Sequence, residues 1–199
     1  MASQFVFKDA RGYVHPSDIL PFVLERTAVH APSRVVVSLH KFTTTQVEWV
    51  RSGGSVAPQG AANFSANVTC GEQSDTWLAC PLPDQAVDSR VPSRGSVIHQ
   101  AYSAQGFEIV SGATDVAGLV MDLITCMKSH WQQFDRRDGT PVTRRLDVKV
   151  PLPVPTGLTV LGRCQARPLS QTWTFRAPEM PGFELAIVAM LLTKRLDRA

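Results

Sequence analysis

The sequence predicts an α+β protein in which one long amphipathic helix packs against an antiparallel sheet. The helix is indicated by apolar residues at i, i+3, i+4, i+7, i+8 and i+11, namely Val116, Leu119, Val120, Leu123, Ile124 and Met127. Strand-like segments joined by short Pro/Gly turns follow it, at residues 144–150, 158–167, 170–177 and 183–196. A helix followed by such a meander must bury its apolar face against the sheet, which sets the fold class.

Composition favours a single folded domain over residues 1–199, divided into an N-terminal helix and strands (1–95) and the helix with its meander (96–199). Hydrophobic residues make up 44% of the chain and charged residues 19%, which excludes a disordered chain. The net charge of +3 is too small to favour nucleic acid as a partner. With no apolar leader and no membrane-length apolar run, we expect a soluble, cytoplasmic protein. The four cysteines form no CxxC pair, so free thiols and no metal are expected.

The N-terminal elements are shorter. Ser17 or Asp18 is expected to cap a helix over residues 19–31. Strand-forming segments follow at residues 34–42, continuing through 43–50, and at 61–69 and 76–80. Residues 81–95, with three prolines, are predicted to be a loop, and residues 96–102 a strand leading toward the long helix, which Thr114 or Ser111 is expected to cap.

The segment from about residue 105 to the end resembles the hot-dog fold of thioesterases and acyl dehydratases. The residues that carry the resemblance are the helix GLVMDLITCMKSHW, the turn at Gly139, the Pro-rich segment RLDVKVPLPVPTGLTVLGRCQAR and the ending Pro181-Gly182-Phe183. The resemblance implies a curved antiparallel sheet wrapped around one long helix, assembled into a dimer or larger homo-oligomer through sheet edges. It covers the C-terminal half, so residues 1–95 are expected to be an N-terminal extension.

The resemblance also implies an acid at or before the start of the central helix, whose free N–H groups would polarise a thioester carbonyl. The matching place begins at Asp115, and His99 precedes it in a strand. We therefore predict His99 and Asp115 as a catalytic pair. A histidine in a strand is also commonly a surface or core residue with no catalytic role.

A polar stripe runs along the long helix, made of Asp115, Gly118, Asp122, Thr125 and Ser129. Gly118, Asp122 and Thr125 are predicted to contact substrate, with Gly118 allowing close approach to the backbone. The alternative is an ordinary solvated helix face.

Arg144 and Arg145 belong to a basic cluster that would hold the phosphates of coenzyme A or the acidic surface of an acyl-carrier protein. Because acids alternate with these arginines, a solvated turn is the alternative. No cofactor of the protein's own is expected, since the substrate would carry coenzyme A or phosphopantetheine.

Three functions remain open from the sequence. The first is an enzyme that hydrolyses an acyl thioester or dehydrates a 3-hydroxyacyl group. The second is a non-catalytic structural protein of the capsid-type β-sandwich class, favoured by many short strands and prolines. The third is a degenerate hot-dog protein that binds an acyl chain without chemistry.

Overall fold

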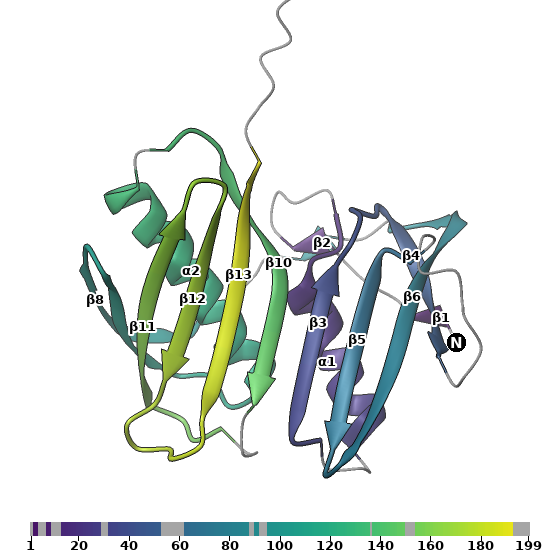
Figure 1. Ribbon diagram of the computed structural model, residues 1–199, viewed down its shortest axis with the longest axis horizontal. Coiled ribbons are helices and arrows are strands. Elements are labelled where there is room, and N and C mark those ends of the chain that lie inside the picture. The colour runs from purple at the N-terminus through teal and green to yellow at the C-terminus, as the bar shows by residue number, and fades with distance from the viewer. Residues whose placement is uncertain are drawn as a thin grey trace, which may run out of the picture.

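The computed structural model describes residues 2–3, 7–8, 13–28, 32–52, 62–87, 90–91, 95–135, 137–149 and 154–192. Its centre is one eleven-stranded sheet with the order β1-β4-β6-β5-β3-β10-β13-β12-β11-β9-β8, and every neighbouring pair is antiparallel. Two helices lie on the same face of this sheet, one behind each half (Figure 1). They contact each other where the two halves meet.

The C-terminal half contains the long helix α2 (Val116–Phe134) and the strands β8 to β13. The strands are β8 (Val97–Ser103), β9 (Gly106–Ser111), β10 (Thr140–Lys149), β11 (Leu158–Arg167), β12 (Ser170–Arg176) and β13 (Glu184–Leu192). The apolar stripe of α2 is buried from Val116 to Trp131, as its spacing predicts. Burial of each such aliphatic side chain is worth about 1.5–3 kcal/mol of transfer free energy, so α2 anchors this half.

The N-terminal half repeats the arrangement on a smaller scale. Helix α1 (Pro16–Thr27) packs on β3 (Arg34–Leu39) and β5 (Phe64–Cys70), and its Phe22 stacks on Trp49 of β4 (Thr45–Arg51). Strand β6 (Gln73–Ala86) and the short β1 (Ala2–Ser3), which lies beside β4, complete this half of the sheet. The cap of α1 is His15, whose side chain accepts from the Ser17 N–H while Asp18 accepts from the His15 N–H. Two further short strands, β2 (Phe7–Lys8) and β7 (Arg90–Val91), pair in parallel.

The two halves join where β3 pairs with β10. Val37 lies opposite Leu146 and Val35 opposite Val148, and all four side chains are buried. In each half, the strand that follows the helix (β3 or β10) lies at this junction. The last strand of the large sheet before the helix (β1 or β9) lies toward the outer edge. The three strands between them follow different orders, β5-β6-β4 in one half and β13-β12-β11 in the other.

The structure corrects several sequence-based expectations. Residues 1–95 are not an appended extension, because residues 16–86 build a helix-and-sheet half of their own. A two-sheet capsid-type sandwich is excluded by the single continuous sheet. The predicted caps are also wrong, since His15 caps α1 and Asp115 caps α2.

Strand boundaries differ as well. Residues 81–86, predicted as loop, continue β6, and residues 34–50 form two separate strands, β3 and β4. Strand β9 was not predicted. At its first residue, Gly106, an added Cβ would overlap the Gly162 carbonyl oxygen of β11, so this close pairing needs glycine. The strand predicted at 183–196 is confirmed over Glu184–Leu192. Its residues 193–196 and the centre of the Pro-rich corner lie outside the described residues.

Candidate functional site

The start of α2 is occupied by the protein's own carboxylate. Asp115 is the N-cap residue, and its Oδ1 accepts a hydrogen bond of 2.7 Å from the Gly118 N–H. Asp115 is exposed, and its position matches the general preference for acids at helix N-termini. A carboxylate there competes with any substrate oxygen for the first-turn N–H groups. The geometry therefore accounts for Asp115 as a cap.

His99 lies on the edge strand β8, opposite Val110 of β9. The neighbours of Val110, Ile109 and Ser111, are buried against α2, so Val110 and His99 lie on the outer face of the sheet. Within the described chain no hydrogen bond or ion pair joins His99 to Asp115. The structure does not bring the predicted catalytic pair together, and its role stays a prediction that the geometry does not favour.

The polar group that the fold does bury is Asp122, two turns into α2 and 1% exposed. Its Oδ2 accepts hydrogen bonds from the Ser96 and Ser111 hydroxyls, both at 2.6 Å. Its Oδ1 accepts the Ser96 backbone N–H at 2.8 Å. A buried carboxylate is costly unless it is hydrogen-bonded in this way. The alternative of a solvated stripe is therefore wrong at this position.

Among the described residues, Oδ1 of Asp122 accepts from a single donor, the Ser96 N–H, whereas a carboxylate oxygen has two lone pairs. Gly95 adjoins this oxygen without a side chain, since a Cβ added at Gly95 would lie 3.9 Å away. Gly95 is itself exposed. The carboxylate thus lies directly beneath Gly95, an exposed residue shortly before β8.

Further polar side chains continue from Asp122 along the contact between α2 and β8. The Tyr102 hydroxyl donates to Gln100 Oε1 at 3.0 Å, and the Cys126 thiol approaches the same oxygen at 3.7 Å. Burial raises the pKa of Tyr102 to about 12. Burial also raises the pKa of Cys126, and the charge of Asp122 adds to that shift, so this thiol is not activated as a nucleophile.

The remaining residues of the stripe serve the helix itself. The Thr125 hydroxyl donates to the Met121 carbonyl at 2.9 Å, and Ser129 donates to the Thr125 carbonyl at 3.3 Å. A Cβ on Gly118 would lie 3.2 Å from the Ala113 Cβ, so this glycine accommodates the approach of the preceding loop. The substrate contacts predicted for Gly118 and Thr125 stay predictions.

Arg144 and Arg145 are on β10, away from the start of α2. Arg145 lies opposite Ser38, on the outer face, and its guanidinium is 3.2 Å from Asp147. Arg144 lies near His40. Burial lowers the pKa of His40, and the positive charge of Arg144 lowers it further. The sheet therefore separates Arg145 from Asp122 and the polar side chains around it.

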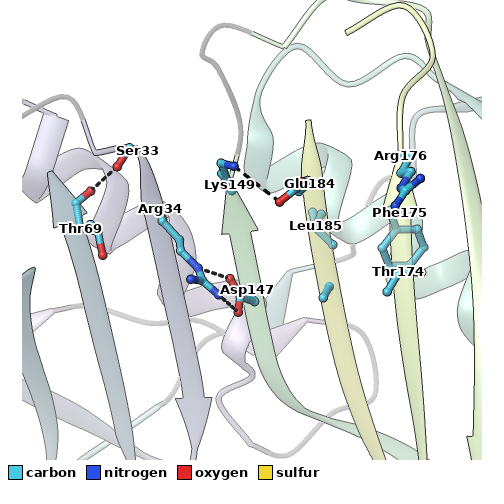
Figure 2. Close-up of a pocket in the computed structure, with 11 residues that line it drawn as sticks. Ser33, Arg34, Thr69, Asp147, Lys149, Thr174, Phe175, Arg176, Glu184 and Leu185 are labelled. Atoms are coloured by element: carbon cyan, nitrogen blue, oxygen red, sulfur yellow. Dashed lines mark hydrogen bonds and ion pairs between the residues drawn. The ribbon is translucent and has the colours of Figure 1, made fainter. Parts of the chain in front are cut away.

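Beside Arg145, the outer face is hollowed where the two halves join. A groove of about 450 Å³ is lined by residues of β5, β3, β10, β13 and β12. Arg34 spans the junction to Asp147 with two hydrogen bonds of 2.7 Å, and Lys149 pairs with Glu184 at 3.6 Å (Figure 2).

Several classes of site find no support within the described residues. No group of three or more His, Cys, Asp or Glu side chains there is placed to hold a metal ion. All four cysteines are free thiols, as the sequence predicts. No helix in the described part of the chain is long and apolar enough to cross a membrane.

The sequence did not single out the groups that bury Asp122. Ser111 was considered only as a cap, and Ser96 only as the first residue of a strand. Asp122 was predicted as a substrate contact within a stripe, and no signal separated it from Asp115. The difference arises from β9 and the segment before β8, which fold over one side of α2.

Comparison with solved structures defines the class of fold. No protein-family model matches the sequence, and no curated protein sequence matches it significantly. The fold is similar to that of a tesB protein from Mycobacterium avium subspecies paratuberculosis, with 9% identity and a TM-score of 0.52 over 95% of this chain and 90% of that one.

Two domains of biosynthetic enzymes are similar over comparable lengths. A bifunctional dehydratase-cyclase domain from ambruticin biosynthesis matches at 8% identity and a TM-score of 0.54, over 97% of this chain and 94% of that one. A pyran synthase domain of the sorangicin pathway matches at 10% identity and a TM-score of 0.55, over 95% and 92%. The likeness identifies a hot-dog fold that extends over nearly the whole chain. The expectation that it covers only the C-terminal half is therefore wrong.

Proposed function

We propose that this protein acts on an acyl thioester, carried by coenzyme A or phosphopantetheine, by hydrolysis or by dehydration of a 3-hydroxyacyl group. The observation that carries the proposal is Asp122, a buried carboxylate on the central helix of a hot-dog fold. Buried ionisable groups with specific hydrogen-bond partners are concentrated at functional sites. The likeness to the dehydratase-cyclase domain supports the substrate class.

In this proposal Asp122 is the general base. For hydrolysis, its Oδ1 takes a proton from a water molecule whose oxygen attacks the thioester carbonyl, and the thiolate leaves with a proton from solvent. For dehydration, the same oxygen takes the proton α to the carbonyl, and the 3-hydroxyl group leaves as water with a proton from solvent. The Ser96 and Ser111 hydroxyls hold Oδ2, so they fix the direction of Oδ1.

The test is turnover of a panel of short, long and aromatic acyl-CoA and 3-hydroxyacyl-CoA substrates. Asp122→Asn is expected to lower kcat/KM by about 10²–10⁴-fold, because it removes the base. Its melting temperature is expected to fall, because the amide oxygen can accept from the two serine hydroxyls but the NH2 group then faces the Ser96 backbone N–H. Circular dichroism at the assay temperature must therefore show that the variant is still folded. Asp84→Asn, at an exposed carboxylate on β6, is the matched control and should leave turnover unchanged.

Asp115→Asn and His99→Ala are assayed alongside. If these two variants lose turnover and Asp122→Asn does not, the catalytic residues are His99 and Asp115, as predicted from the sequence, and not Asp122. If no substrate is turned over but an acyl-CoA raises the melting temperature, the protein binds thioesters without chemistry. If there is neither turnover nor a thermal shift, the proposal fails.

A further inference from the structure

Outside the candidate site, the outer face of the sheet carries two exposed arginines that have no carboxylate partner among the described residues. Arg163 of β11 and Arg176 of β12 are both exposed. Leu161 lies opposite Arg176, and Arg163 opposite Thr174, so the two guanidinium groups are on adjacent strands of one face. In the described part of the chain, neither has a carboxylate within ion-pair distance.

These arginines line two hollows that adjoin each other. One of about 440 Å³ is lined by Leu161, Arg163, Thr174 and Arg176. The groove at the junction of the halves shares Thr174 and Arg176 with it and continues to Lys149 and Arg34 (Figure 2). Together they cross six consecutive strands, β5, β3, β10, β13, β12 and β11. That is roughly 24 Å at about 4.8 Å per strand, the length of about seven extended residues.

We propose that this face is a docking surface for an acidic segment of a partner protein, whose carboxylates bind Arg163 and Arg176. Charge complementarity at the unpaired arginines carries the proposal. The groove also contains the paired Asp147 and Glu184. Carboxylates at those places disfavour a polymer or surface of uniformly negative phosphates. They suit a polypeptide, which supplies N–H donors as well as carboxylates, and the half-exposed Leu161 offers it an apolar contact.

The test is fluorescence anisotropy of a labelled octaglutamate peptide with the full chain at low and at physiological salt. The double variant Arg163→Ala/Arg176→Ala is expected to bind about tenfold more weakly, with a shallower salt dependence. The matched control is Arg26→Ala/Arg51→Ala, which removes the same charge from α1 and β4. It should bind the peptide like the wild type, and circular dichroism must show that both variants are folded.

Three results would overturn the proposal. The first is no binding of the peptide by the wild type, and the second is equal weakening in both double variants, which would mean attraction to net charge alone. In the third, inorganic pyrophosphate, a single-stranded RNA octamer or phosphatidylserine vesicles bind the arginine face more tightly than the peptide. Asp122 is on the other side of the sheet, so Arg163→Ala/Arg176→Ala should keep the wild-type turnover of acyl thioesters. Failure of the docking proposal can therefore be told apart from failure of the proposed function.

Discussion

Asp115 and Asp122 are on the same helix, and their surroundings give them different roles. Asp115 is exposed and satisfies a first-turn N–H group, whereas Asp122 is buried and held by two hydroxyls and one backbone N–H. The sequence could place both on one polar stripe, but not distinguish them. The distinction depends on Ser96 and Ser111, which reach α2 only after β8 and β9 have folded beside it. For the same reason, the sequence could not show that His99 lies on the other face.

Asp147 gives a prediction for the dependence of stability on pH. Burial opposes its ionisation, but the hydrogen bonds and charges of Arg34 and Arg145 outweigh burial and hold the pKa of Asp147 below its usual range. A lowered pKa stabilises the folded state above the unfolded-state value, near 4, and this stability is lost as the pH falls through the lower folded-state value.

We therefore expect Asp147→Asn to unfold more easily at pH 7, by about 1 kcal/mol, because Arg34 is half exposed. At pH 3 or below its difference from the wild type should shrink. Urea unfolding at both pH values measures this, with Asp75→Asn, at the more exposed Arg51–Asp75 pair, as the control that should change less. An equal loss at both pH values would contradict the assigned role of the ion pair.

At the scale of elements, patterns that depend on local sequence were predictable and long-range pairing was not. The spacing of apolar residues predicts α2 and the meander β11–β12–β13. Prolines 81 and 83 predicted a loop but lie in β6, because residues beyond Ala79 pair only with β4. A strand paired on one side has no second neighbour that needs the missing N–H, so proline is tolerated there. The sequence alone does not say which strands have one neighbour.

The cap of α2 gives a second prediction. Asp115→Ala removes the acceptor for the Gly118 N–H and should lower the free energy of unfolding by about 1 kcal/mol. Asp115→Asn keeps an acceptor and should cost less. Both variants should retain acyl-thioester turnover under the proposed function. Unchanged stability together with lost turnover would instead support a catalytic role for Asp115.

At the scale of the whole molecule, the chain contains two helix-and-sheet halves that share one sheet through β3 and β10. The edge-to-edge pairing that the resemblance implied between subunits is thus present within one chain at this junction. The N-terminal helix and strands were predicted, but not as a second helix-and-sheet half. The reasons are that α1 is short and contains Pro21, and that its strands follow a different order from those of the C-terminal half. The two faces of the shared sheet are then free for different tasks, with α2 and Asp122 on one and the groove on the other.

Under the proposed function, an acyl thioester reaches Asp122 between α2 and β8, on the side covered by Gly95. A crystal structure of the protein with a non-hydrolysable thioether analogue of an acyl-CoA tests this binding mode. We expect the carbon that replaces the thioester carbonyl to lie one water molecule away from Asp122 Oδ1, with Gly95 moved aside and the Ser96 and Ser111 hydroxyls still bonded to Oδ2. An analogue bound elsewhere, with Gly95 still covering Oδ1, would contradict the proposed role of Asp122.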